Sequence, residues 1–189
     1  MYKMNEQNNN TRVIKIFLIG DSDVGKTSIL KQFIENRFDE INQLIIGIDF
    51  SYVHIDNDND NDIDNDNQPV KLVIWDPSGQ SRFKDITRLY YKKTNIVIFV
   101  YSITDRKSFL NMIEWFEDIE KYAPPNIYKV LVGNKSDLEA RRKVTYEEGE
   151  IISQIYNCNM FYETSAKDNL SIKEIFINSV MNIIELKDN

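Results

Sequence analysis

The chain has little cysteine and little histidine: Cys158 and His54 are the only ones among 189 residues. A single cysteine excludes an internal disulfide framework and is typical of a reducing compartment. We therefore interpret Cys158 as a small packed residue. A single histidine also argues against a metal site built on several histidines.

Long hydrophobic runs are missing as well. None approaches the roughly 20 residues that are needed to span a bilayer. Residues 1–11 are polar and rich in asparagine, without the apolar segment of a secretory signal. We expect a disordered N-terminal segment at 1–11 and one domain of ordinary size at 12–187.

Positive charge is absent from one segment in particular. Residues 56–69 read DNDNDNDIDNDNQP, with six aspartates and no Lys or Arg. Without these six charges the formal charge of −7 would be −1, so the chain lacks the basic balance of a nucleic-acid-binding protein. A calcium loop is the alternative, but Asn61 and Asn67 stand where an EF-hand needs Gly and Glu. We interpret 56–69 as a mobile, low-complexity loop.

Strand-like and helix-like patterns alternate along the chain. Thr145 with Glu148, and Ser171 with Glu174, match the capping box that opens a helix. The expected strands are 13–19, 48–55, 70–75, 96–101, 129–133 and 161–164, and the expected helices are 27–36, 107–122, one from 145 and one from 171 to about 186. This alternation predicts an α/β fold with a mostly parallel six-stranded sheet and helices on both faces.

Residues 20–27 read GDSDVGKT and match the pattern GxxxxGK[ST] between an expected strand and an expected helix. Glycines let backbone N–H groups turn toward phosphate oxygens, and the helix N-terminus adds a favourable dipole. Lys26 would place its charge on the outer phosphates, and the Thr27 hydroxyl would bind Mg²⁺. The alternative is an ordinary glycine-rich turn. The predicted phosphate-binding residues are Asp23, Val24, Gly25, Lys26, Thr27 and Ser28.

Asp23 is unusual within this phosphate loop, which we define as residues 20–27. Its carboxylate would repel the phosphates unless it pointed outward. We therefore expect Asp23 to weaken the retention of a nucleotide.

A second motif, Asn134-Lys135-Ser136-Asp137, follows the expected strand at 129–133. It would lie at the carboxyl edge of the sheet, where ligands of open α/β folds bind. The Asp137 carboxylate can accept hydrogen bonds from both donors on the Watson–Crick edge of guanine, whereas adenine presents an acceptor at N1. A site built for such bonds rejects the analogue that lacks them. An ATP-using phosphotransferase, the alternative, predicts no such segment.

Two further features belong to this base-binding prediction. The Lys135 side chain would lie along the plane of the base. Ser165, Ala166 and Lys167 follow the last expected strand and would offer a backbone N–H to the guanine carbonyl. The predicted ligand is therefore a guanine nucleotide.

Together these motifs resemble those of the Ras superfamily of small GTPases, and of the Rab family in particular. The segments that carry the resemblance are GDSDVGKT, IGIDF at 46–50, KLVIWDPSGQSRF at 71–83, NKSD and ETSAK at 163–167. Their order and spacing match from about 13 to 186. The resemblance implies the three-layer G domain, which is a P-loop NTPase fold. It also implies that the protein binds GTP and GDP with Mg²⁺, hydrolyses GTP and controls vesicle traffic through effectors.

The resemblance also assigns roles to single residues. Asp76 would hold Mg²⁺ through water, the Gly79 N–H would meet the third phosphate, and Gln80 would orient the attacking water. Phe38 would pack against the guanine or the ribose, with a core aromatic as the alternative. Effectors and regulators would dock on the switch segments 45–50 and 79–93.

The docking surface implied by the resemblance has two recognisable parts. Phe50, Trp75 and Tyr90 stand where the family places an effector-facing aromatic patch. The second switch segment is basic and ends at Lys92 and Lys93, so an acidic partner surface is an alternative to a merely solvated face.

The chain departs from the family pattern at the switches. Ile45 replaces the threonine that normally binds Mg²⁺, and Pro77, Ser78 and Ser81 replace the usual residues around Gln80. Ile45 has no side-chain oxygen, and Pro77 has no backbone donor. We therefore expect a low rate of GTP hydrolysis, and a non-enzymatic guanine-nucleotide-binding scaffold with a defective switch is the alternative.

The chain also has no cysteine near its end for prenylation, since Cys158 is inside the domain. Membrane association thus has no support from a lipidation site. We expect a monomer in the cytoplasm that reaches intracellular membranes through partner proteins.

Overall fold

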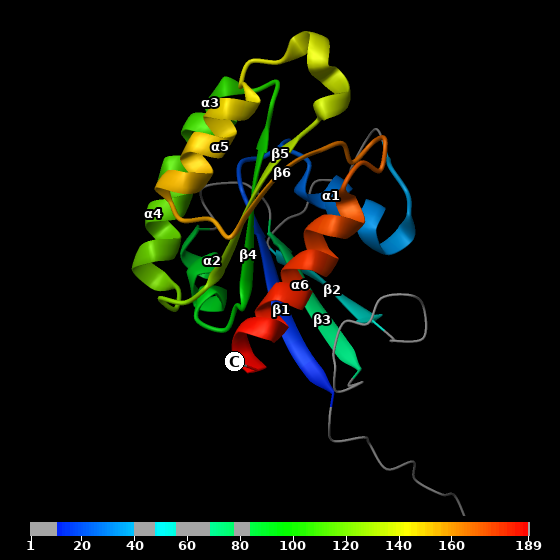
Figure 1. Ribbon diagram of the computed structural model, residues 1–189, viewed down its shortest axis with the longest axis vertical. Helices are drawn as coiled ribbons and strands as arrows, with labels where there is room; N and C mark the ends of the chain where they lie inside the picture. Colours follow the sequence, from blue (N-terminus) through cyan, green and yellow to red (C-terminus); the bar gives the residue numbers. More distant parts are fainter. Residues whose placement is uncertain (1–10, 40–47, 56–68, 78–83, 189) are drawn as a thin grey trace, which may run out of the picture.

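The computed structural model describes residues 11–39, 48–55, 69–77 and 84–188. In the last of these ranges, the side chains are described from 87 to 186. Its centre is a six-stranded sheet in the order β2-β3-β1-β4-β5-β6, shown in Figure 1. The strands are β1 (Arg12–Ile19), β2 (Ile48–Ile55), β3 (Val70–Pro77), β4 (Ile96–Ser102), β5 (Tyr128–Asn134) and β6 (Met160–Thr164). All six strands lie where the sequence predicts them.

The pairing of the strands confirms a mostly parallel sheet. β1 pairs in parallel with both β3 and β4, and β4–β5 and β5–β6 are also parallel. The edge strand β2 alone runs antiparallel, with Phe50 opposite Trp75. Because the other five strands point the same way, the loops that follow them meet at one edge of the sheet.

Helices cover both faces of this sheet. They are α1 (Lys26–Glu35), α2 (Lys84–Tyr91), α3 (Arg106–Leu110), α4 (Met112–Tyr122), the 3-10 helix η2 (Ser136–Arg141), α5 (Tyr146–Ile155) and α6 (Ile172–Asp188). Residues of α1 and α6 form one core with alternate residues of the strands, and residues of α2, α3, α4 and α5 pack on the other face. The fold is therefore the predicted three-layer α/β arrangement.

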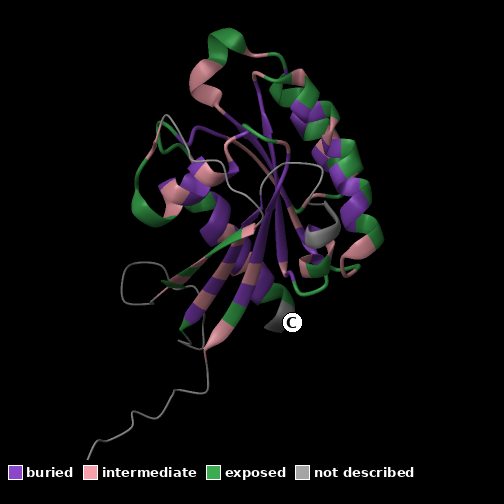
Figure 2. Cartoon of the chain, turned by 180° about the vertical axis from the view of Figure 1, so that it is seen from behind, coloured by how far each residue is buried: buried purple, intermediate pink, exposed green. Residues whose placement is uncertain are grey.

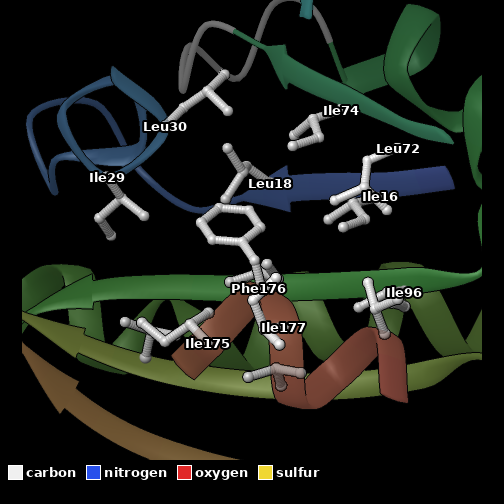
Figure 3. Packing of buried hydrophobic residues seen from close by; sticks show 14 of the residues in the cluster. Ile16, Leu18, Ile29, Leu30, Leu72, Ile74, Ile96, Ile175, Phe176 and Ile177 are labelled. Carbon is white, nitrogen blue, oxygen red and sulfur yellow. The ribbon is translucent and has the colours of Figure 1, made fainter. Parts of the chain in front are cut away.

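Burial follows the position of each strand in the sheet. All seven residues of the central strand β4 are buried, whereas buried and partly exposed residues alternate along β3, as Figure 2 shows. Figure 3 shows the core under α1 and α6, where Leu18 of the sheet lies next to Phe176 of α6, and Ile29 of α1 and Ile74 of β3 belong to the same core. This hydrophobic layer fixes the position of α1, whose first residue belongs to the phosphate loop.

The structure differs from the sequence prediction at one long helix. The expected helix 107–122 is two helices that meet at Asn111, whose N–H bonds to the carbonyls of Lys107 and Phe109. The first of them begins one residue early because the Asp105 side chain accepts a hydrogen bond from the Lys107 N–H. The sequence analysis also missed α2 and η2.

The two expected capping boxes have different outcomes. At Thr145 both reciprocal hydrogen bonds with Glu148 are present, which confirms the prediction. Ser171 instead has a left-handed φ of 55° and accepts a hydrogen bond from the Ile175 N–H through its carbonyl. No helix within the described residues has both the length and the apolar character of a membrane span.

Candidate nucleotide-binding site

The phosphate loop leaves the carboxyl end of β1 and enters α1, in the strand–loop–helix context that its motif requires. Gly20 has φ 145°, and a Cβ there would lie 2.1 Å from the Val100 carbonyl oxygen. Gly25 has φ 98°, and a Cβ there would lie 2.2 Å from Asn134 Nδ2. Side chains at 20 and 25 would therefore collide with the sheet, and only glycine allows this path.

Lys26 points back into the loop. Its Nζ donates to the backbone carbonyls of Gly20 at 3.0 Å and Asp21 at 2.7 Å. The side chain is 6% exposed, and this burial lowers the Lys26 pKa, opposed by the carboxylates of Asp76, Asp21 and Asp23. Because the cation is held away from water, a phosphate oxygen would gain a strong charge-assisted contact with it.

Thr27 and Asp76 form the second polar pair of the site. The Thr27 hydroxyl donates to Asp76 Oδ2 across 2.6 Å. Asp76 is 1% exposed, and burial raises its pKa to about 6. Its Oδ1 is buried without a hydrogen-bond partner among the described residues.

That orphaned oxygen fits a divalent cation. The described residues contain no cluster of three or more His, Cys, Asp or Glu side chains that could enclose a metal by themselves. Mg²⁺ does not need one, because it usually takes one or two protein oxygens and completes its shell with water and phosphate. Thr27 and Asp76 supply such a donor pair.

Asn134 joins the phosphate loop to both base-binding segments. Its Nδ2 donates to the Val24 carbonyl at 2.8 Å, and its Oδ1 accepts from the Ala166 N–H at 3.2 Å. The residue is 2% exposed. One buried side chain thus holds together three segments that are far apart in the sequence.

The other base-binding residues are close to this junction. Asp137 Oδ1 accepts a hydrogen bond from the Ser165 hydroxyl at 2.9 Å. Lys135 has a left-handed φ of 70°, and its Nζ donates to the Asp23 carbonyl at 2.5 Å. The segments 134–137 and 165–167 therefore meet beside the phosphate loop, as the topology predicted.

Sequence reasoning missed Arg142, which ties these segments together from outside. Its guanidinium donates to both carboxylate oxygens of Glu139 and to both of Glu163, at 2.6–2.7 Å. The hydrogen bonds to Glu163 have the largest effect on the Arg142 pKa, followed by those to Glu139, and both raise it. The only sequence signal was that Glu163 precedes the segment 165–167; the partner is set by the fold.

The remaining predicted residues have mixed outcomes. Ser28 is buried in α1 and Lys167 is exposed. Phe38 is partly buried and packs against the core under α1 and α6, as expected of a core aromatic residue. Its contact with a nucleotide stays a prediction. Ile45, Gly79 and Gln80 lie outside the described residues, as do Ser78, Ser81 and the tract 56–68.

The expected effector-facing aromatics lie next to one another. Phe50 and Trp75 are opposite each other in the β2–β3 register, and the rings of Trp75 and Tyr90 are 5.6 Å apart. Phe50 is 56% exposed, so part of this patch faces outward.

A phosphate loop, a Thr–Asp pair beside it and a base-binding corner define a nucleotide-binding domain of the P-loop class. The model of the Ras family matches residues 15–185. The chain is 39% identical to the mouse Ras-related protein Rab-15 over 164 residues, which cover 87% of this chain and 73% of the relative. It is 40% identical to the GTP-binding protein ypt2 of Schizosaccharomyces pombe, over 87% of this chain and 78% of that relative. It is 41% identical to the Ras-related protein RabC of Dictyostelium discoideum, over 86% of this chain and 79% of that relative.

These matches extend over almost the whole described domain. The chain belongs to the Ras family and, within it, to the Rab family of small GTPases.

Proposed function

We propose that this protein binds GTP and GDP together with Mg²⁺, hydrolyses GTP to GDP and phosphate, and regulates vesicle traffic through effector proteins. The observation that carries the proposal is the Asn134 side chain, which links Val24 of the phosphate loop to Ala166 of the base-binding corner. With this link in place, a polyphosphate on the loop would have its base near 134–137 and 165–167.

Selectivity for guanine rests on Asp137. One of its oxygens already accepts from the Ser165 hydroxyl, which fixes the orientation of the carboxylate. Two donors side by side on guanine match a carboxylate, whereas adenine would leave this acceptor facing another acceptor. Ser165 is thus a positioning residue for the base-reading carboxylate.

Thr27 and Asp76 would hold the metal, directly or through water. Bound Mg²⁺ supplies positive charge that offsets the charge developing on the phosphates. Lys26, held by the Gly20 and Asp21 carbonyls, would contribute a second positive charge that needs no reorganisation during the reaction.

Hydrolysis depends on the switch residues. Gln80 would orient the attacking water, so catalysis consists of positioning and electrostatics rather than covalent chemistry. The second candidate is a guanine-nucleotide-binding scaffold that hydrolyses GTP slowly or not at all. The specific observation in its favour is Ile45, which has no hydroxyl to offer to Mg²⁺.

Partner proteins would dock on the switch segments 45–50 and 79–93 and on the aromatic side chains of Phe50, Trp75 and Tyr90. The partial exposure of Phe50 supports such a surface. We propose that the protein acts as a monomer in the cytoplasm and reaches intracellular membranes through these partners.

Two experiments test the proposal. The purified protein is denatured and the released nucleotide is identified by chromatography: GDP or GTP near one per chain is expected, and adenine nucleotide would contradict the proposal. Single-turnover hydrolysis of bound GTP, with and without Mg²⁺, then separates the two candidates. Measurable Mg²⁺-dependent turnover supports the GTPase, and its absence supports the scaffold.

A further inference from the structure

The side chain of Asp21, which the proposed function does not use, is held by two side chains from the face of the sheet opposite α1. Its Oδ2 accepts a hydrogen bond from Asn111 Nδ2 at 2.6 Å, and its Oδ1 accepts one from Trp115 Nε1 at 3.0 Å. Asn111 is the residue at which α3 ends and α4 begins, and Trp115 lies one turn further along α4. Both carboxylate oxygens are therefore engaged by one helix junction.

The main chain of Asp21 has a second partner inside the loop. Its carbonyl oxygen accepts from Lys26 Nζ at 2.7 Å. The main chain of Asp21 thus contacts the phosphate-binding lysine, while the side chain of Asp21 contacts α4. The anchor on the α4 side is firm, because Trp115 is 6% exposed and belongs to the same core as Phe116.

The chemistry of the contact selects an aspartate. Both partners are donors, so the residue between them must present two acceptors, which a carboxylate does and a neutral amide does not. An asparagine of the same size would turn its NH₂ group toward one of the two donors. A hydrogen bond to a charged acceptor is also stronger than one between neutral groups.

We propose that Asp21 is a positioning residue of the phosphate loop, anchored by Asn111 and Trp115, and that this tie to α4 slows the release of the bound nucleotide. The inference rests on the proposed function, because it assumes that the loop holds a nucleotide. Release would require the loop to open, and the tie opposes any opening that moves residue 21. Changes at the α3–α4 junction would therefore alter the rate of nucleotide exchange.

A mutant cycle tests the tie. Trp115→Phe removes one donor and Asp21→Ala removes both acceptors, and release of a fluorescent GDP analogue is followed in each variant and in the double variant. Trp115→Phe should speed release about tenfold, the effect of losing one hydrogen bond to a charged group, and should have no further effect in the Asp21→Ala background. Equal effects in both backgrounds would mean that Trp115 acts through packing alone and would overturn the proposal. Asp21→Asn, which keeps the size of the residue, should also speed release.

The matched control is Tyr128→Phe at the start of β5, the opposite end of the strand from Asn134. It also changes a buried aromatic residue and removes one hydrogen bond, from Asn182 Nδ2 at 2.9 Å. The Tyr128→Phe variant should have a lower thermal stability than the unmodified protein, while its rate of nucleotide release stays unchanged. Acceleration equal to that of Trp115→Phe would attribute both effects to general destabilisation, against the proposal.

A readout without nucleotide separates this inference from the proposed function. The chain has two tryptophans, so a Trp75→Phe background leaves the fluorescence of Trp115 alone. Asp21→Ala should shift its emission maximum, because the indole N–H loses a charged partner. An unshifted spectrum would overturn the tie, whereas a protein that carries no guanine nucleotide would count against the proposed function instead.

Discussion

The Thr27 hydroxyl and the Asp76 carboxylate are joined across 2.6 Å, although the two residues are 49 positions apart. The contact connects the first turn of α1 to the end of β3. Asp76 is almost fully buried, and its Oδ1 has no hydrogen-bond partner in the described parts of the chain. A buried carboxylate with an unused oxygen is costly unless a cation compensates it.

The charge of Asp76 should therefore control the effect of Mg²⁺ on nucleotide release. In the unmodified protein, EDTA should speed the release of a fluorescent GDP analogue. Asp76→Asn keeps the shape but removes the charge, so release should be fast already and almost insensitive to EDTA.

Asp118 provides the matched control for this experiment. It is also a buried aspartate with one oxygen that has no hydrogen-bond partner among the described residues, but its other oxygen pairs with Arg88 at 2.6 Å and not with Thr27. Asp118→Asn should leave the response to EDTA intact. A normal response of Asp76→Asn would show that Asp76 does not act through the metal.

Replacing Asp23 by glycine should slow the release of the nucleotide. Asp23 is exposed and has a left-handed φ of 63°, a conformation that glycine adopts without strain. The change removes a negative charge beside the phosphates, and we expect release to slow about threefold, because exposed charges interact weakly. Ser22→Gly, at the exposed neighbour, adds flexibility without changing the charge and should not slow release. An unchanged rate for Asp23→Gly would refute the repulsion.

Ile45→Thr should raise the preference of the protein for triphosphate over diphosphate. A hydroxyl at 45 could bind Mg²⁺ in the triphosphate form, and losing such a contact costs about 1.5–3 kcal/mol. The restored preference should be of the order of tenfold or more, measured as the ratio of GTP and GDP affinities. Ile45→Val, which also lacks a hydroxyl, should leave the ratio as it is. If threonine and valine give the same ratio, the switch does not depend on this oxygen.

Cys158 should react slowly with iodoacetamide in the folded protein. Burial raises the Cys158 pKa to about 12, and only the thiolate reacts. At pH 8 the native rate should be on the order of a thousandfold below that of the urea-unfolded chain. It should climb about tenfold for each pH unit, since the pH stays below the native pKa. A native rate that levels off near pH 9 would contradict an elevated pKa.

The strands were predictable because each has a local pattern, an apolar run in the central strands and, in β2, apolar and aromatic residues interleaved with polar ones. The bounds of β2 in the structure are those expected, Ile48–Ile55. The helix at 107–122 was wrong as a single helix because apolar residues such as Phe109 and Phe116 keep helical spacing across Asn111. The side chain at the break bonds to Asp21, 90 positions away, and no local pattern contains that information.

The site shows the same division between local and distant information. The phosphate loop and the segment at 134–137 are local motifs, and the structure brings them together as expected. The partners of Asp21 and Arg142 come from elements distant in the sequence, so only the fold reveals them. The helix α2 was missed because it is short: it has eight residues, half of them polar or charged, and its apolar Leu89 is 73% exposed.

Guanine recognition by Asp137 is the central claim, and a competition titration of GDP and ADP on nucleotide-free protein tests it most directly. The unmodified protein should prefer GDP by about four orders of magnitude, as a site built for hydrogen bonds to its ligand does, and Asp137→Ala should lose most of that preference while keeping its fold. Equal affinities for GDP and ADP in the unmodified protein, or an unchanged preference in Asp137→Ala, would contradict the account.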